Sequence, residues 1–466
     1  MNELLERLRA VVGNAYLIVE ADAMSGYVTD WRGRYRGSAG AVVRPGNSEE
    51  LAAVVSACTD AGVAMVPQGG NTGLCGGATP IGGEVIISLT RLNRIRGVDT
   101  DNATITVEAG CTLSQVQEAA ERVDRLFPLS LAAEGTATIG GNLSTNAGGV
   151  QVLRYGNARE LCLGLEVVLP DGRIWDGLRG LRKDNTGYDL KQLFIGAEGT
   201  LGFISAAVLK LYPRPRQQVT AWATVADPAR AVALLSQLRG HIGDRLTAFE
   251  LIDRTGLDLV LKHIPDSREP LPGRSPWQVL IEVSDTIAGS DLRPRVEAVL
   301  GEAVASELIV DVALAESLGQ ATAFWRLRES LSEAQKVEGL SIKHDVSLPV
   351  SHIAEFIDIA GGKLREEFPG VRIVCFGHVG EGNLHYNLSR SPADESDRFV
   401  AVAPRVNAIV HDVGSDLGGS ISAEHGVGQL KRAELTRYKS GLEMELMRSL
   451  KRAFDPRGLV NPGKVI

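Results

Sequence analysis

The stretch PQGGNTGLCGG at residues 67–77 sets the first expectation for the fold, because it follows a short apolar run typical of a buried strand. Consecutive backbone N–H groups in such a loop can form an anion-binding nest, and the missing side chains let a diphosphate approach closely. The stretch matches neither G-x-G-x-x-G nor G-x-x-x-x-G-K-[ST]. Alone, it would be interpreted as a tight structural loop.

A second glycine-rich stretch, AEGTATIGGNLSTNAGG at residues 133–149, strengthens the ligand-binding interpretation. Its only charged residue is Glu134, and its pattern favours neither a strand nor a helix. A long irregular loop in a compact domain is usually functional or disordered. Its small side chains and amides suit a large, flat, polar ligand.

The rest of the chain divides at the sequence PRPR, residues 213–216, which marks a domain boundary. Before it, strands and helices alternate, with a capped helix from Ser48 to Gly62 and a hairpin at residues 163–175. After it, longer helices are expected at residues 228–238, 292–303, 314–337 and 350–367, with strands at 278–283, 342–346 and 371–375. We therefore expect a first domain at 1–216, an α+β cap at 217–421 and a helical C-terminal segment at 422–466.

Composition excludes several classes of protein. The 466 residues exceed one usual core, and 44% hydrophobic and 23% charged residues are ordinary for a globular protein. A net charge of −8 argues against a nucleic-acid or anionic-membrane surface, and no apolar stretch is long enough to span a bilayer. The five scattered cysteines form no C-x-x-C, which favours a reducing, cytoplasmic location.

A second group of candidate functional residues lies in the cap and the C-terminal segment. The stretch GHVGEGNLH at residues 377–385 places His378 and His385 around a glycine-rich turn, and flanking strands would bring both imidazoles together. Glu424 and His425 form a further donor pair in a glycine-bounded segment. Two histidines and one carboxylate leave open positions on a divalent metal, as in catalytic sites. Alone, such a spacing more often belongs to hydrogen-bonded structural histidines than to metal ligands.

The two glycine-rich stretches, with RYG at 154–156, RKDNTGYDL at 182–190 and GAEGTLG at 196–202, resemble the vanillyl-alcohol-oxidase type of FAD domain. In detail they are similar to the branch that contains D-2-hydroxyglutarate dehydrogenase, D-lactate dehydrogenase and one component of glycolate oxidase. The resemblance implies an α+β fold: a two-subdomain FAD-binding domain and an α+β cap with an antiparallel sheet. It also implies a homodimer.

The resemblance also implies which residues contact the flavin. Some relatives attach the flavin to a histidine in the first loop, and because this loop has none, non-covalent FAD is expected. The implied FAD contacts are Pro67, Gln68, Gly69, Gly70, Asn71, Thr72, Gly73, Leu74, Pro128, Thr138, Ile139, Gly140, Gly141, Asn142, Thr145, Asn146, Gly148, Gly149, Tyr155, Glu198, Gly199, Gly202, Ile204 and Asn461.

In the cap and the C-terminal segment, the resemblance makes His378, His385 and Glu424 ligands of a divalent metal and His425 the catalytic base. The metal is expected to be zinc, although manganese or iron would fit the same ligands. The implied substrate contacts are Arg328, Ser332, Lys343 and Asn387. A guanidinium suits a carboxylate, so Arg328 and Lys343 are candidates for holding a second carboxylate of the substrate. The branch has threonine where this chain has Ser332, which leaves that contact open. Arg326 is expected on a solvated helix face.

The sequence therefore predicts an FAD-dependent dehydrogenase that oxidises a D-2-hydroxy acid, with D-2-hydroxyglutarate as the expected substrate. Alternatives are a D-lactate (or other monocarboxylate) dehydrogenase, an oxidase that passes electrons to oxygen, and a non-redox nucleotide-binding module. The electron acceptor is expected to be an electron-transfer flavoprotein or a quinone, through which the enzyme could be peripheral to a membrane. No G-x-S-x-G occurs, which argues against a serine hydrolase.

Overall fold

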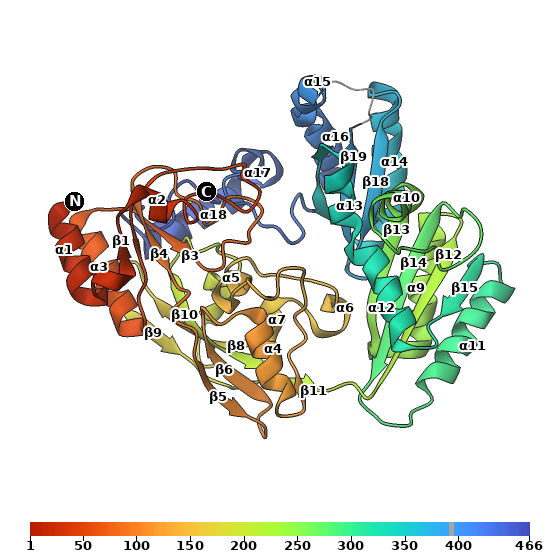
Figure 1. Ribbon diagram of the computed structural model, residues 1–466, viewed down its shortest axis with the longest axis horizontal. Helices are drawn as coiled ribbons and strands as arrows, with labels where there is room; N and C mark the ends of the chain where they lie inside the picture. The colour runs from red at the N-terminus through yellow and green to blue at the C-terminus, as the bar shows by residue number, and fades with distance from the viewer. Residues whose placement is uncertain (391–395) are drawn as a thin grey trace. The chain divides into compact units, whose positions relative to one another are not determined.

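The protein is described from a computed structural model that covers residues 1–390 and 396–466. The chain forms two compact units, whose elements are labelled in Figure 1. Unit 1 comprises Met1–Gly149, Gly156–Arg214 and Glu424–Ile466, and unit 2 comprises Val150–Tyr155 and Pro215–Ala423. The short segment Val150–Tyr155 groups with unit 2, although it lies inside the first domain expected from the sequence.

Unit 1 is built on two larger sheets and one short ladder. The first sheet is mixed and runs, in order, β1 (Leu17–Ile18), β2 (Ala39–Val43), β4 (Glu84–Ser88) and β3 (Met65–Gln68). The second is antiparallel and runs β5 (Ile95–Asp99), β6 (Thr104–Glu108), β10 (Phe203–Lys210), β8 (Cys162–Val168) and β9 (Ile174–Gly177). The short ladder joins β11 (Tyr212–Pro213) to β7 (Arg125–Leu126).

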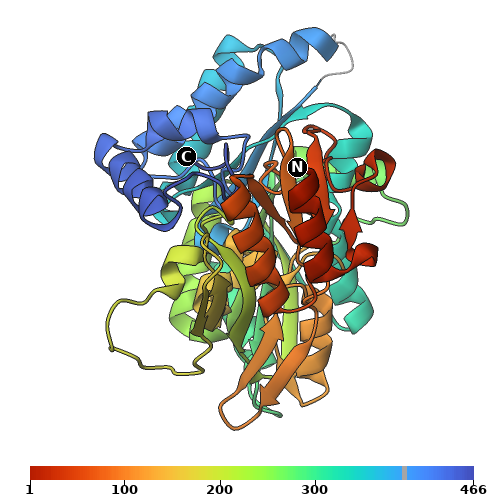
Figure 2. The ribbon, with the colours of Figure 1, turned by 90° about the vertical axis from the view of Figure 1, so that its left-hand side faces the viewer.

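The helices of unit 1 lie around these sheets, and α1 packs beside α3 (Figure 2). They are α1 (Asn2–Val12), α2 (Ala21–Met24), α3 (Ser48–Ala61), α4 (Leu113–Glu121), α5 (Ile139–Ser144), α7 (Ala158–Leu161), α8 (Lys191–Phe194), α17 (Arg432–Tyr438) and α18 (Gly441–Phe454). The helix expected from Ser48 forms, but its N-cap is Asn47, whose side chain accepts from the Glu50 N–H. Ser48 instead contacts the buried Glu166 carboxylate at 2.5 Å.

Unit 2 is built on one antiparallel sheet, which confirms the α+β class expected for the cap. In order, it runs β15 (Asp311–Leu314), β12 (Gln217–Val225), β14 (Trp277–Asp285), β13 (Leu246–Asp253), β18 (Arg372–Gly377), β19 (Asn383–Ser389) and β16 (Ser341–Ile342). A further strand, β17 (Asp345–Ser347), also pairs with β19.

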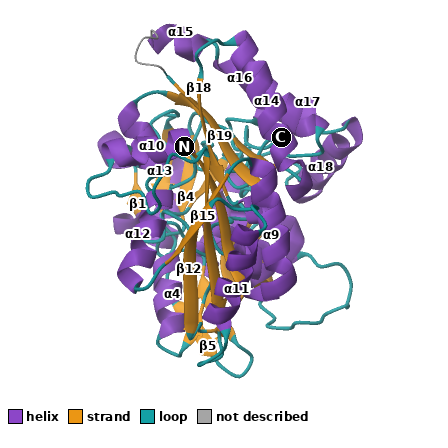
Figure 3. Cartoon of the chain, turned by 90° about the vertical axis from the view of Figure 1, so that its right-hand side faces the viewer, coloured by secondary structure: helices purple, strands orange, loops and turns teal. Residues whose placement is uncertain are grey.

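Helices cover both faces of this sheet, and Figure 3 shows α9 and α12 on opposite sides of β12. One face packs against α9 (Pro228–Ile242), α11 (Leu292–Ala305), α14 (Ile353–Glu367) and α16 (Ala403–Asp416). The other packs against α10 (Arg254–His263), α12 (Leu318–Glu329) and α13 (Leu331–Glu338). The single helix expected at residues 314–337 is therefore wrong, because residues 311–314 form β15 and the helix breaks at Ser330.

Two short helices complete unit 2, α6 (Val152–Tyr155) and α15 (Ser396–Ala401). In the part of the chain that the structure describes, no helix is both long and apolar enough to cross a membrane. The five cysteines, all within the described ranges, are buried and not joined in disulfides.

Candidate active site

The two glycine-rich loops of unit 1 contact each other directly. A Cβ atom at Gly69 would lie 2.2 Å from Thr138 Oγ1, and one at Gly70 would lie 2.0 Å from the Thr136 carbonyl oxygen. Positions 69 and 70 therefore need glycine because the second loop occupies the space of a side chain. By contrast, a Cβ atom at Gly73 would meet no atom within 4 Å, so that position is open.

A cavity of about 480 Å³ opens beside this contact, a volume typical of small-molecule sites. Among the described residues, Thr138 Oγ1 and Asn142 Nδ2 are buried without a hydrogen-bond partner, although buried polar atoms are normally paired. The two glycine-rich loops and these polar atoms, which we call the FAD cradle, fit a polar dinucleotide such as FAD. The cavity is lined by Gly26, Tyr27, Gln68, Gly69, Gly70, Asn71, Thr90, Asn93, Gly110, Thr112, Gln115, Gly135, Thr136 and Thr138.

The expectation that the second loop contains no helix is wrong, because residues Ile139–Ser144 form α5. The N–H of Asn142 donates to the Thr138 carbonyl oxygen at 2.8 Å, which starts the helix. A Cβ atom at Gly140 would lie 2.7 Å from the Ala109 Cβ, so glycine here serves close packing against the sheet segment behind it. Tertiary packing thus overrides the low helix propensity of the glycines.

Four of the residues expected to contact FAD have a positive φ without being glycine: Asn71 (52°), Asn146 (49°), Glu198 (50°) and Asn461 (48°). Such conformations are uncommon and cluster at functional sites. Asn71 is held by its side chain, whose Nδ2 donates to the Thr29 carbonyl oxygen at 2.9 Å.

Glu198 and Asn461 use their side chains to join segments of unit 1. The Glu198 carboxylate accepts from the N–H groups of Val427 (2.7 Å) and Gly428 (2.8 Å), and burial raises its pKa. Asn461 Nδ2 donates to the carbonyl oxygens of Glu198 (2.8 Å) and Gly77 (3.1 Å). Both side chains therefore hold neighbouring segments of unit 1 in place through hydrogen bonds to the protein.

The other expected FAD contacts lie in unit 1, apart from Tyr155, which belongs to α6 of unit 2. Those in unit 1 lie in the two loops, in β3 and β10, in the segment before β10 and, for Pro128, just after β7. They are Pro67, Thr72, Leu74, Pro128, Ile139, Gly141, Thr145, Gly148, Gly149, Gly199, Gly202 and Ile204.

In unit 2, strands flank the His378–His385 turn as expected. Strands β18 and β19 pair antiparallel with Phe376 opposite His385, and a short 3₁₀ turn connects them. Their hairpin brings the His378 and His385 rings to a centroid distance of 6.4 Å. The sequence prediction that the turn gathers both imidazoles is therefore confirmed within this unit.

Glu250 of β13 links His378 to Arg328. Its carboxylate lies 2.6 Å from His378 Nδ1 through Oε1 and 2.7 Å from Arg328 Nε through Oε2. Burial raises the pKa of Glu250, but the charges of His378 and Arg328 outweigh burial and hold it at about 2. The ionised carboxylate accepts the Nδ1 proton of His378, which leaves Nε2 as the ring atom that can bind a metal.

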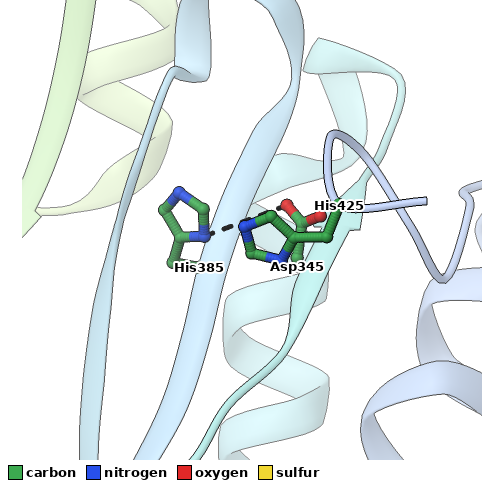
Figure 4. Close-up of side chains that lie close together, drawn as sticks. All are labelled: Asp345, His385 and His425. Atoms are coloured by element: carbon green, nitrogen blue, oxygen red, sulfur yellow. Dashed lines mark ion pairs between the residues drawn. The ribbon is translucent and has the colours of Figure 1, made fainter. Parts of the chain in front are cut away.

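His385 lies beside a second buried carboxylate, that of Asp345 in β17 (Figure 4). The distance from His385 Nδ1 to Asp345 Oδ1 is 3.8 Å, and the two residues are partners across β17 and β19. Asn383 Nδ2 donates to the same Asp345 oxygen at 3.0 Å. His378 is hydrogen-bonded to one carboxylate and His385 lies beside another, an arrangement typical of metal sites, so this donor set fits a zinc-like ion.

The expected substrate contacts occupy different environments. Arg328 is buried, with its guanidinium 5.0 Å from the centre of the Phe376 ring. The Asn387 amide is engaged by the protein, since it donates to Gln335 (2.9 Å) and accepts from the His344 N–H (3.0 Å).

Lys343 is half-buried between β16 and β17, whereas Ser332 is exposed on α13. Arg326 is exposed, and its guanidinium donates to the Pro265 carbonyl oxygen. Glu424 and His425 are the first residues of the last segment of unit 1.

Sequence reasoning missed Glu250 and Asp345, which both contact expected metal ligands. Glu250 lies in the interior of the buried strand β13, LTAFELID, and a charge inside a buried strand is itself a signal. Asp345 follows the candidate Lys343 by two residues, but only the register of β17 shows that it faces His385.

Comparisons with known proteins follow the same division of the chain. Residues 39–177 match the family model described as an FAD binding domain. Residues 214–465 match the C-terminal domain of FAD linked oxidases. Together, these matches cover most of the chain.

Relatives match nearly the whole chain. A D-2-hydroxyglutarate dehydrogenase of Danio rerio is 38% identical over 451 residues, 96% of this chain and 82% of its own. One from Xanthomonas citri is 35% identical over 459 residues, 98% of this chain and 96% of its own. A putative D-lactate dehydrogenase of Schizosaccharomyces pombe is 36% identical over 446 residues, 94% of this chain and 84% of its own.

Among solved structures, p-cresol methylhydroxylase superposes with a TM-score of 0.79 at 18% identity, covering 100% of this chain and 96% of its own. An alkyldihydroxyacetonephosphate synthase gives 0.76 at 17% identity, covering 99% of this chain and 84% of its own. These likenesses confirm the fold. The chain belongs to the FAD-linked oxidase family of flavoenzymes, in the branch that the sequence resemblance indicated.

Proposed function

We propose that this protein is an FAD-dependent dehydrogenase that oxidises D-2-hydroxyglutarate to the 2-oxo acid beside a divalent metal ion. The observation that carries the proposal is the buried His378–His385 hairpin with its two supporting carboxylates, in a chain whose relatives are named D-2-hydroxyglutarate dehydrogenases. Histidines with carboxylates beside them suit a divalent ion that binds a hydroxy acid.

FAD, when bound in the cradle of unit 1, supplies the hydride acceptor. A divalent metal held by His378, His385 and Glu424 would lower the pKa of the substrate hydroxyl. Chain connectivity supports Glu424 as the third ligand. Its neighbour Ala423 donates its N–H to the Asp345 carbonyl oxygen at 3.2 Å. Glu424 is therefore joined directly to a residue that hydrogen-bonds to Asp345, the cross-strand partner of His385.

The chain's own residues would orient the substrate and remove its proton. His425 follows Glu424 directly, and its imidazole would accept the proton of the 2-hydroxyl oxygen, a common role of histidine in acid–base catalysis. Arg328 and Lys343 would hold the distal carboxylate. Asn387 and Ser332 complete the set of proposed contacts.

Oxidation of D-lactate is a second candidate, which a specific observation favours. Ser332 is exposed on α13, so one of the expected contacts to a distal carboxylate is not held in a buried position. A monocarboxylate needs no such clamp. The relative of Schizosaccharomyces pombe is named a putative D-lactate dehydrogenase.

An anaerobic absorbance titration tests the function. D-2-hydroxyglutarate should bleach the flavin spectrum; a chelator should abolish bleaching and zinc should restore it. Equal bleaching by D-lactate would support the second candidate, and a colourless protein would refute both. His385→Ala should lose chelator-sensitive bleaching, whereas the control His352→Ala, an exposed histidine of unit 2, should retain it.

Several further properties are part of this proposal. We expect non-covalent FAD, released by acid denaturation, and an electron-transfer flavoprotein or a quinone as acceptor. Peroxide release in air would instead indicate an oxidase. The buried thiols are compatible with a cytoplasmic location, which fractionation of cells would test. A homodimer is expected, measurable by light scattering.

A further inference from the structure

The carboxylate of Glu250 makes two contacts that serve different proposed roles. One oxygen faces a proposed metal ligand, His378, and the other faces a proposed substrate clamp, Arg328. All three side chains are buried, with exposed fractions of 1% for Glu250, 8% for His378 and 9% for Arg328. Water therefore cannot replace either contact without a cost.

The three residues come from different elements on one face of the unit 2 sheet. Alternation along β13 places Glu250 on the same face as Ile252, which packs in the core under α10, α12 and α13. Arg328 reaches this face from α12, and His378 follows Phe376 by two residues at the end of β18. The contact is therefore built by tertiary packing and not by one local motif.

We propose that Glu250 is a positioning residue that couples the metal site to the recognition of the substrate's distal carboxylate. This inference rests on the proposed function. By accepting the Nδ1 proton of His378, Glu250 selects the tautomer whose Nε2 binds metal. By accepting from Arg328 Nε, it fixes the guanidinium against Phe376 and leaves the terminal nitrogen atoms for a carboxylate.

Glutamine at position 250 cannot satisfy both partners. Its amide has one acceptor oxygen, whereas His378 Nδ1–H and Arg328 Nε–H are both donors. One of them would face the amide NH₂ group and lose its contact. Glu250→Gln should therefore weaken metal binding and substrate selectivity together.

The experiment uses the full-length flavoprotein and two readouts. Zinc affinity, measured by competition with a chromophoric chelator, should fall 10–100-fold in Glu250→Gln, as for other residues that orient a metal ligand. The ratio of kcat/KM for D-2-hydroxyglutarate to that for D-lactate should fall at least tenfold. Should this variant not fold, Glu250→Asp keeps the charge but is one methylene too short for both contacts, and should show the same two losses.

Glu282→Gln is the matched control, because Glu282 is a buried carboxylate of the neighbouring strand β14 that binds Trp325 Nε1 at 2.6 Å. It should leave both readouts within threefold. The coupling is refuted if Glu250→Gln keeps zinc affinity, or if it loses affinity without a change in substrate ratio. Failure of wild-type protein to bleach with either acid would refute the proposed function instead.

Discussion

At the scale of single residues, glycine is needed for different reasons at two positions of the first loop. Gly70 is required by packing within the protein, whereas Gly73 has open space beside it. Gly70→Ala places its Cβ atom 2.0 Å from the Thr136 carbonyl oxygen, so the loops must shift. Overpacking of this kind costs about 1–3 kcal/mol, and we expect a lower melting temperature of the flavin-free protein. Thermal unfolding followed by circular dichroism measures the loss.

Gly73→Ala is the matched variant, because its Cβ atom meets no atom within 4 Å. The melting temperature of the flavin-free protein should stay unchanged. If the FAD diphosphate lies against this position, flavin affinity should fall, as measured by fluorescence titration. Equal flavin affinity in Gly73→Ala and wild type would place the diphosphate elsewhere in the cradle.

At the scale of elements, the N-cap of α10 predicts a dependence of stability on pH. Asp253 accepts from the Gly256 N–H at 2.8 Å, and burial raises its pKa from 3.8 to about 7. The folded state thus binds a proton that the unfolded state has lost above about pH 4. The free energy of unfolding should therefore fall as the pH rises from 4 to 7. The loss is roughly 4 kcal/mol at most, because the folded and unfolded pKa values of Asp253 differ by about three.

Asp253→Asn keeps a good N-cap and removes the titration. Its melting temperature should therefore change less than that of wild type between pH 5 and pH 8. Asp227→Asn, at the more exposed N-cap of α9, should leave the pH dependence of wild type. If Asp253→Asn kept the wild-type dependence, the buried carboxyl would not be its source.

Elements also show what the sequence could and could not predict. The His378–His385 hairpin was predictable, because apolar strands and a glycine-rich turn are local signals. Helix α5 was not, since packing of Gly140 on Ala109 decides it. The break at Ser330 carries neither proline nor glycine, and it follows from packing of α12 and α13 on the sheet.

At the scale of the whole molecule, the segment Val150–Tyr155 shows why residues of one unit can lie inside the sequence of the other. Arg154 Nη1 donates to the carbonyl oxygen and to Oγ of Ser284, both at 2.6 Å, across 130 positions of sequence. Glu250 and His378 are likewise 128 positions apart. Contacts at such separations leave no periodic signal in the sequence. Motifs can therefore indicate candidate metal ligands such as His378, but not residues such as Glu250 that orient them.

The division into two units predicts how ligands change thermal unfolding. The two glycine-rich loops proposed to hold FAD lie in unit 1, whereas His378 and His385 lie in unit 2. Calorimetry of the flavin-free, metal-free protein should resolve two transitions, since a domain with its own core can unfold separately. Arg154→Ala removes both bonds to Ser284 and should lower only the transition of unit 2, which identifies it.

Adding FAD at about 100 times its dissociation constant stabilises the state that binds it by about 2.7 kcal/mol, which should raise the transition of unit 1 by several degrees. Zinc should raise the transition of unit 2. If Glu424, which begins the last segment of unit 1, is the third ligand, zinc should raise both transitions together. In Glu424→Ala the zinc effect should then be weaker and confined to unit 2. A single transition that FAD and zinc raise equally would show that the chain unfolds as one cooperative body despite its two cores.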